Sequence, residues 1–164
     1  MFKTLTLLLA ILLWACEGLA AAFEYVDPAD KGSTLTIETS PPTVAIGDIA
    51  EPATLCPRTD RFVCLLSRTI NFAVPKKIDP ATPRWEQAGH IYEIASNEDL
   101  LILGARIRHV FRIKSLDGDR RITYLYSKER GLLGLQVASP VGQRLFLTTK
   151  RIGYGAVSAS GHRF

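Results

Sequence analysis

The sequence is poor in the residues and motifs that usually mark catalytic and metal sites. It contains three histidines and three cysteines, and their spacing matches no common set of metal ligands. No serine lies in the Gly-x-Ser-x-Gly turn of many hydrolases, and the glycines form no phosphate-binding loop. We therefore expect no metal site and no bound cofactor, and no motif indicates a particular reaction.

Long apolar runs are also missing, apart from one at the N-terminus. An uncharged, mostly apolar run over residues 5–15 follows Lys3, and the residues at 18–22 are mostly small. This pattern predicts a secretory signal peptide over residues 1–22. The run is about half as long as the roughly 20 residues that a membrane-spanning helix needs. We therefore expect a periplasmic or secreted protein with no transmembrane span after cleavage.

A second interpretation of the N-terminal segment stays open. Residues 13–16, Leu-Trp-Ala-Cys, resemble the bacterial lipobox, in which the cysteine becomes the lipidated N-terminus. Trp14 departs from that pattern, because a small or medium residue is usual there. Lipidation of Cys16 would make the chain a lipid-anchored protein of the envelope.

The scarcity of cysteine is informative about the exported part of the chain. Cleavage near residue 22 removes Cys16 and leaves Cys56 and Cys64. Two cysteines in an oxidising compartment predict one disulfide bond. Because the loop between them is short, we expect a contribution of about 2–3 kcal/mol to stability. Two buried free thiols are the alternative.

Charge and composition divide the remaining chain. Residues 23–60 have two basic and seven acidic residues and several prolines, whereas residues 61–164 have 17 basic and 8 acidic ones. We predict an irregular acidic N-terminal arm over 23–60, with one strand at 34–39. A β domain over 61–155 and a flexible tail over 156–164 follow. The expected fold is mostly β: a single small domain built on an antiparallel meander of about six to eight strands, as a sandwich or a partly open barrel.

The clearest local signal is a predicted hairpin between residues 104 and 127. Apolar and basic residues alternate along its first strand, which is typical of a half-buried strand. Asp117-Gly118 is a preferred pair for a two-residue turn. That turn predicts that Phe111 faces Tyr124 and that His109 faces Tyr126 on the buried side. We also predict a turn at 97–99 and a frayed segment at 153–155.

The other side of this hairpin is strongly basic. A set of cations falls there and forms a candidate surface for an anion or an acidic partner: Arg106, Arg108, Arg112, Lys114, Arg120 and Arg121. Like charges on neighbouring strands repel each other slightly, and a bound anion would offset that cost. A solvated sheet face without a ligand is the alternative.

These observations favour a binding protein over an enzyme. We expect an exported, non-enzymatic β protein that binds a protein partner or an anionic polymer or lipid of the envelope, as an inhibitor, adaptor or assembly factor. Export argues against nucleic acid as the partner. A small exported hydrolase that uses His90 or His109 as a base is the alternative, and it would require one of these side chains near a Ser, Asp or Glu in a cleft.

Overall fold

The protein is an all-β molecule. The computed structural model describes residues 21–79, 81–116, 121–140 and 142–157, so the predicted signal segment and the end of the predicted tail lie almost wholly outside it. Within these ranges the chain forms thirteen strands: β1 (Ala22–Val26), β2 (Thr34–Thr39), β3 (Pro42–Ile46), β4 (Ile49–Pro52), β5 (Thr54–Leu55), β6 (Phe62–Leu66), β7 (Asn71–Pro75), β8 (Arg84–Gln87), β9 (His90–Ile102), β10 (Ala105–Ser115), β11 (Arg121–Ser127), β12 (Gly131–Ser139) and β13 (Gly142–Thr148).

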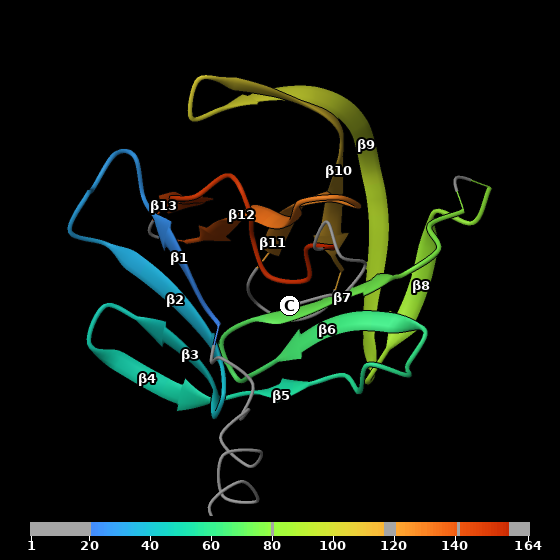
Figure 1. The fold of residues 1–164 in the computed structure, drawn as a ribbon, viewed down its shortest axis with the longest axis horizontal. Coiled ribbons are helices and arrows are strands. Elements are labelled where there is room, and N and C mark those ends of the chain that lie inside the picture. The colour runs from blue at the N-terminus through green and yellow to red at the C-terminus, as the bar shows by residue number, and fades with distance from the viewer. Residues whose placement is uncertain (1–20, 80, 117–120, 141, 158–164) are drawn as a thin grey trace, which may run out of the picture.

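The strands form one large sheet and one small sheet. The large sheet has ten antiparallel strands in the order β4-β3-β2-β1-β13-β12-β11-β10-β9-β8, and the small sheet has the order β5-β6-β7. Figure 1 shows the large sheet curving around β6 and β7, which lie across its concave side. The sheet stays open, with β4 and β8 at its edges. The prediction of a mostly β, antiparallel meander is confirmed, with more strands than the six to eight expected.

The main hydrophobic core fills the space between the two sheets. The small sheet contributes the buried Cys64, Leu65 and Phe72, which pack against buried residues of the large sheet. Buried tyrosines bring polar atoms into this core, and several of their hydroxyls donate to backbone carbonyls. The hydroxyls of Tyr92 and Tyr124 both donate to the Asn71 carbonyl, so that β9 and β11 are tied to β7.

The long β9–β10 hairpin is bent and covers part of the opposite, outer face of the large sheet. The register of the two strands shifts between Ile107 and Val110 and again next to Ile113. The shifts are β-bulges, which kink a strand pair. Beyond them, Ile102 and Ile107 pack with Val110, Leu125 and Leu133 in a second, smaller core. At the top of Figure 1, the end of this hairpin curls over the strands behind it.

The bulge overturns one feature of the predicted hairpin. His109 was expected among the buried residues, but it is exposed and has a φ of 54°, while Val110 is fully buried. The extra residue in β10 reverses the faces of the strand, so alternation does not run unbroken from residue 106 to residue 115.

The predicted register of the β10–β11 pair is also wrong. The structure pairs Phe111 with Tyr126 and Ile113 with Tyr124, a shift of two residues from the prediction. The predicted turn, Asp117-Gly118, lies outside the described residues. With Lys114 paired to Thr123, this register does not centre a two-residue turn on residues 117–118. Because the shift is even, the buried side chains keep their predicted face.

One predicted turn and one segment predicted to be frayed differ from the structure. Residues 97–99 lie inside β9, where the carboxylates of Glu98 and Asp99 pair with arginines of β10 rather than ending the strand. The segment 153–155 is buried rather than frayed. The Tyr154 hydroxyl donates to the Cys64 carbonyl over 2.6 Å, and a Cβ at Gly153 would lie only 1.5 Å from the Leu132 carbonyl oxygen.

The acidic N-terminal segment is more regular than predicted. The expected strand at 34–39 is β2, but β1, β3, β4 and β5 also lie within residues 22–55. This segment joins the large sheet through a strand that is distant in the sequence. β1 pairs with β13, and Tyr25 faces Thr148. No helix with the length and apolarity to cross a membrane occurs in the part of the chain that the structure describes.

Candidate functional site

The predicted basic surface lies on the outer face of the large sheet. In the part of β10 that follows the bulge, Arg112 and Lys114 point away from the buried Phe111 and Ile113 because side chains alternate along a strand. Lys114 pairs with Thr123 of β11, and Arg121 shares the face of Thr123. The structure therefore brings Arg112, Lys114 and Arg121 to one side of two neighbouring strands.

Two of the predicted arginines are paired with carboxylates of β9. The Arg106 guanidinium lies 3.0 Å from the Asp99 carboxylate, and Arg112 contacts Glu98. The Arg112 hydrogen bond lowers the pKa of Glu98, and the backbone N–H of His109, with Arg106, lowers the pKa of Asp99. These arginines stabilise their own hairpin and are partly neutralised, so they offer less charge to a ligand.

Lys114 and Arg121 differ from these two arginines. Both side chains are exposed, and neither forms an ion pair with any residue in the described ranges. Glu93 stands opposite Lys114 on β9, yet no ion pair joins the two. The basic surface is therefore divided into a neutralised part near the hairpin bend and a cationic part near the end of β10.

The cationic part borders a groove of about 660 Å³. Strands β10 to β13 line it with Lys114, Ser115, Leu116, Arg121, Ile122, Thr123, Gln136, Ala138 and Gln143. Its two charged side chains are both cations, and the hydroxyls and amides beside them can donate hydrogen bonds to oxygen atoms of an anion. Among the described residues of this lining there is no carboxylate.

Sequence reasoning missed the contribution of β12 and β13 to this groove. Gln136 pairs with Thr123, and Ala138 pairs with Arg121, while Gln143 pairs with Ala138. Alternation along residues 131–148 would have placed these side chains opposite the buried ones. Their strands could be aligned with β11 only once the registers were known.

The remaining predicted cations lie elsewhere. Arg108 is exposed in the bulge of β10, next to His109, and does not line the groove. Arg120 lies outside the described residues, between β10 and β11. The predicted surface is thus not one continuous patch.

His90 and His109, the two candidate bases of the hydrolase alternative, lie outside this groove. His90 begins β9, and His109 contacts Asp99 through its backbone N–H over 3.2 Å. Neither lines the groove. Within the described ranges there is also no group of three His, Cys, Asp or Glu residues that could hold a metal ion.

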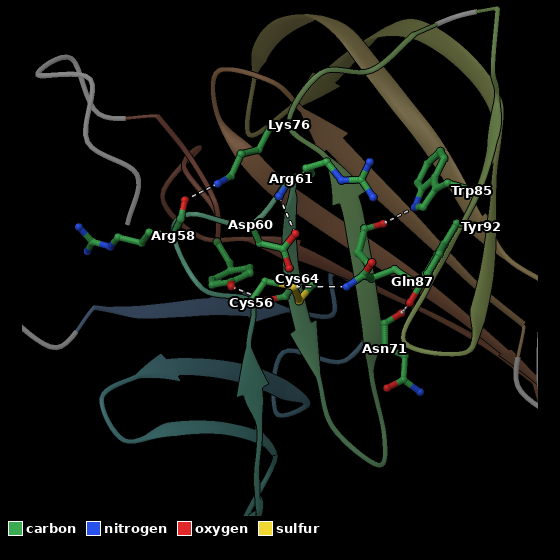
Figure 2. The surroundings of a disulfide bond; sticks show 12 residues. Cys56, Arg58, Asp60, Arg61, Cys64, Asn71, Lys76, Trp85, Gln87 and Tyr92 are labelled. Carbon is green, nitrogen blue, oxygen red and sulfur yellow. Dashed lines mark hydrogen bonds between the residues drawn. A yellow bond between two sulfur atoms is a disulfide. The ribbon is translucent and has the colours of Figure 1, made fainter.

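The predicted disulfide is present. Cys56 follows β5 and Cys64 lies in β6, with a Cα–Cα distance of 5.1 Å, and Cys64 is buried in the main core. Figure 2 shows the Gln87 amide directed at the sulfur of Cys56, 3.9 Å away. It also shows the Lys76 ammonium reaching the Arg58 carbonyl across the same loop. These contacts fix the loop between β5 and β6 against β7 and β8.

The chain matches no protein-family model, no curated protein and no solved structure. What can be said of its function therefore comes from its own residues.

Proposed function

We propose that this chain is an exported binding protein without catalytic activity, and that its groove takes acidic groups of a macromolecular partner. The observation that carries the proposal is the pairing of charges along β10 and β11. Glu98 and Asp99 neutralise Arg112 and Arg106, whereas Lys114 and Arg121 form no ion pair with the described residues and lie beside a groove rich in hydrogen-bonding groups.

The chemistry of the groove favours an acidic chain over a small apolar ligand. The groove is open and shared by four strands, so it suits an extended polymer, and its cations lie on neighbouring strands. Charged groups across an interface attract the partner and set its orientation. Carboxylate and sulfate groups can both accept hydrogen bonds from lysine and arginine, so an acidic protein segment and an acidic polysaccharide share the required chemistry.

The disulfide supports export. Such bonds form and persist in oxidising compartments and are rare in the cytosol of most organisms. The Cys56–Cys64 bond is therefore compatible with the periplasmic or extracellular location that the N-terminal segment predicts.

The test is equilibrium binding of the exported protein to polyglutamate and to dextran sulfate, with neutral dextran as the uncharged reference. We expect binding to the two acidic polymers alone, and weakening as salt rises from low to physiological concentration. The double variant Lys114→Gln/Arg121→Gln should bind roughly tenfold more weakly, equivalent to about 1.4 kcal/mol.

The matched control is Lys31→Gln/Arg58→Gln, which removes the same charge from exposed sites away from the groove. Equal losses in both double variants would show a general charge effect and contradict the groove. A preference for one of the two polymers would identify carboxylate or sulfate as the favoured group.

A further inference from the structure

The end of the β9–β10 hairpin exposes two leucines to solvent. Leu101 is 75% exposed and Leu103 47% exposed, whereas Ile102 between them is buried in the second core. The hairpin end therefore has one packed face and one apolar face turned to solvent. Ile152, 50% exposed, follows Arg151, whose guanidinium donates to the Leu103 carbonyl over 3.0 Å.

The turn itself makes Leu103 unusual. Ile102 pairs with Ala105, and the two residues between them, Leu103 and Gly104, have φ values of 51° and 71°. A two-residue turn of this kind favours Asn or Asp followed by Gly, because positive φ is unfavourable for other residues. Leucine at this position neither eases the turn nor gains full burial. The fold alone gives no reason for an apolar side chain here.

Several cations neighbour the exposed leucines across the strand pair or along the chain. Arg106 stands directly opposite Leu101, Arg108 is exposed in the adjacent bulge, and the exposed Lys150 precedes Arg151, which contacts the Leu103 carbonyl. Because Arg106 is paired with Asp99, the charge that the tip presents comes mainly from the other three cations. Apolar side chains that project among cations are the combination that binds anionic membrane surfaces.

We propose that the tip of the β9–β10 hairpin inserts Leu101 and Leu103 into the interface of an anionic lipid membrane, with the neighbouring cations on the headgroups. The tip is held rigidly for this contact, because Ile102 and Ile107 pack on Leu125 and Leu133.

A lipid surface fits this tip better than a protein partner does. The exposed apolar residues sit on a hairpin that turns back at the upper limit of the molecule in Figure 1, rather than in a groove. A stable protein interface usually buries about 800 Å² on each side. Two or three projecting side chains do not provide that area, but they suffice to reach the boundary between headgroups and acyl chains.

The test is flotation of the exported protein with vesicles of phosphatidylcholine, with and without phosphatidylglycerol. We expect binding only when phosphatidylglycerol is present. Leu101→Ser should weaken it roughly tenfold, the order expected for losing one inserted leucine. The matched control is Ile49→Ser on β4, a residue 77% exposed in the turn region of another hairpin, which should bind as the unchanged protein does.

A second variant separates insertion from folding. Leu103→Asn suits the positive φ of the turn, so it should leave thermal stability unchanged or raised while still weakening vesicle binding. Equal vesicle binding by Leu101→Ser, Leu103→Asn and Ile49→Ser would overturn the proposal. A second result would also overturn it: the unchanged protein forms a dimer and does not bind vesicles, and the two leucine variants are monomers. The tip would then be an interface between copies of this chain.

This inference and the proposed function can fail separately. The Lys114→Gln/Arg121→Gln variant changes the groove and leaves the leucines in place, so it should retain at least half of the vesicle binding while losing polymer binding. Loss of both activities in that variant would contradict a distinct role for the hairpin tip.

Discussion

Single hydroxyl groups in the core connect strands that are far apart in the sequence. The buried Tyr25 hydroxyl donates to the Leu132 carbonyl and accepts from the backbone N–H of Tyr154. Burial raises the pKa of Tyr25 well above its ordinary value, so the group stays neutral and keeps both bonds. The Asn71 carbonyl, in contrast, accepts from two tyrosines, Tyr92 and Tyr124.

Because of this difference, removing the hydroxyl of Tyr25 and removing that of Tyr124 should change the free energy of unfolding by different amounts. We expect Tyr25→Phe to lower the free energy of unfolding by about 1–3 kcal/mol, because a buried N–H loses its partner. Tyr124→Phe should cost less, about 1 kcal/mol, since Asn71 keeps the Tyr92 hydroxyl. Urea denaturation of the two variants measures the difference, and a larger loss in Tyr124→Phe would contradict this reading of the core.

The Glu51 carboxylate connects the large sheet to the small sheet. Glu51 of β4 accepts from the Thr69 backbone N–H over 2.7 Å and lies 3.8 Å from the Arg68 guanidinium, in the turn between β6 and β7. Burial alone would raise the pKa of Glu51, but the hydrogen bonds from Ser67 and Thr69 outweigh it and hold the pKa below its ordinary value.

A lowered pKa in the folded state stabilises the protein above the pKa of the unfolded chain, and the effect is lost as pH falls through the folded value. We therefore expect Glu51→Gln to lower stability by about 0.5–1 kcal/mol at neutral pH. The difference from the unchanged protein should shrink below about pH 4. Thermal unfolding across this pH range measures it, with Glu86→Gln on the exposed part of β8 as the control. A difference that is the same at all pH values would contradict the role of the charge.

At the scale of elements, the sequence predicted which face of a strand is buried better than it predicted which strands pair and in which register. The all-β class, the strand at 34–39 and the buried side of 111–126 follow from alternation, which is a local property of the chain. The register of β10 and β11 depended on Asp117-Gly118, and a favourable turn pair does not require that the turn form there. Two of the two-residue turns in the described ranges, at Ala88-Gly89 and Leu103-Gly104, have less characteristic first residues.

The candidate groove shows the same limit. Lys114 and Arg121 were identified from the sequence because they alternate with apolar residues. The neutralisation of Arg106 and Arg112 was missed, because the acidic pair at 98–99 was interpreted as a turn rather than as part of a strand. Bulges, ion pairs across strands and the position of β12 and β13 are set by tertiary contacts that local patterns do not contain.

At the scale of the whole molecule, the disulfide closes a loop between two neighbouring strands of the small sheet. The separation of Cys56 and Cys64 is 8 residues, and such a short loop corresponds to about 2–3 kcal/mol of stability. We expect reduction of the unchanged protein, or replacement of both cysteines by alanine, to lower the free energy of unfolding by that amount. Urea denaturation with and without reductant measures it, and the double variant should not respond to the reductant.

Export has a direct test in the mass of the mature chain. We expect mass spectrometry of the protein from the envelope or medium to show an N-terminus within residues 21–23, as cleavage after the small residues requires. A chain that begins at a lipid-modified Cys16 would instead show an anchored protein. A chain retaining Met1 in the cytosol would contradict export and the compartment in which the disulfide forms.

For the exported chain that we propose, the pairing of β1 with β13 has a consequence for the order of folding. The two strands are separated by about 120 residues, and contacts of such long range slow folding because a large loop must close first. A chain that crosses from its N-terminus onward delivers β1 early and its partner almost last. In such a chain the middle of the large sheet is completed only at the end of translocation, and until then β1 presents an unpaired edge.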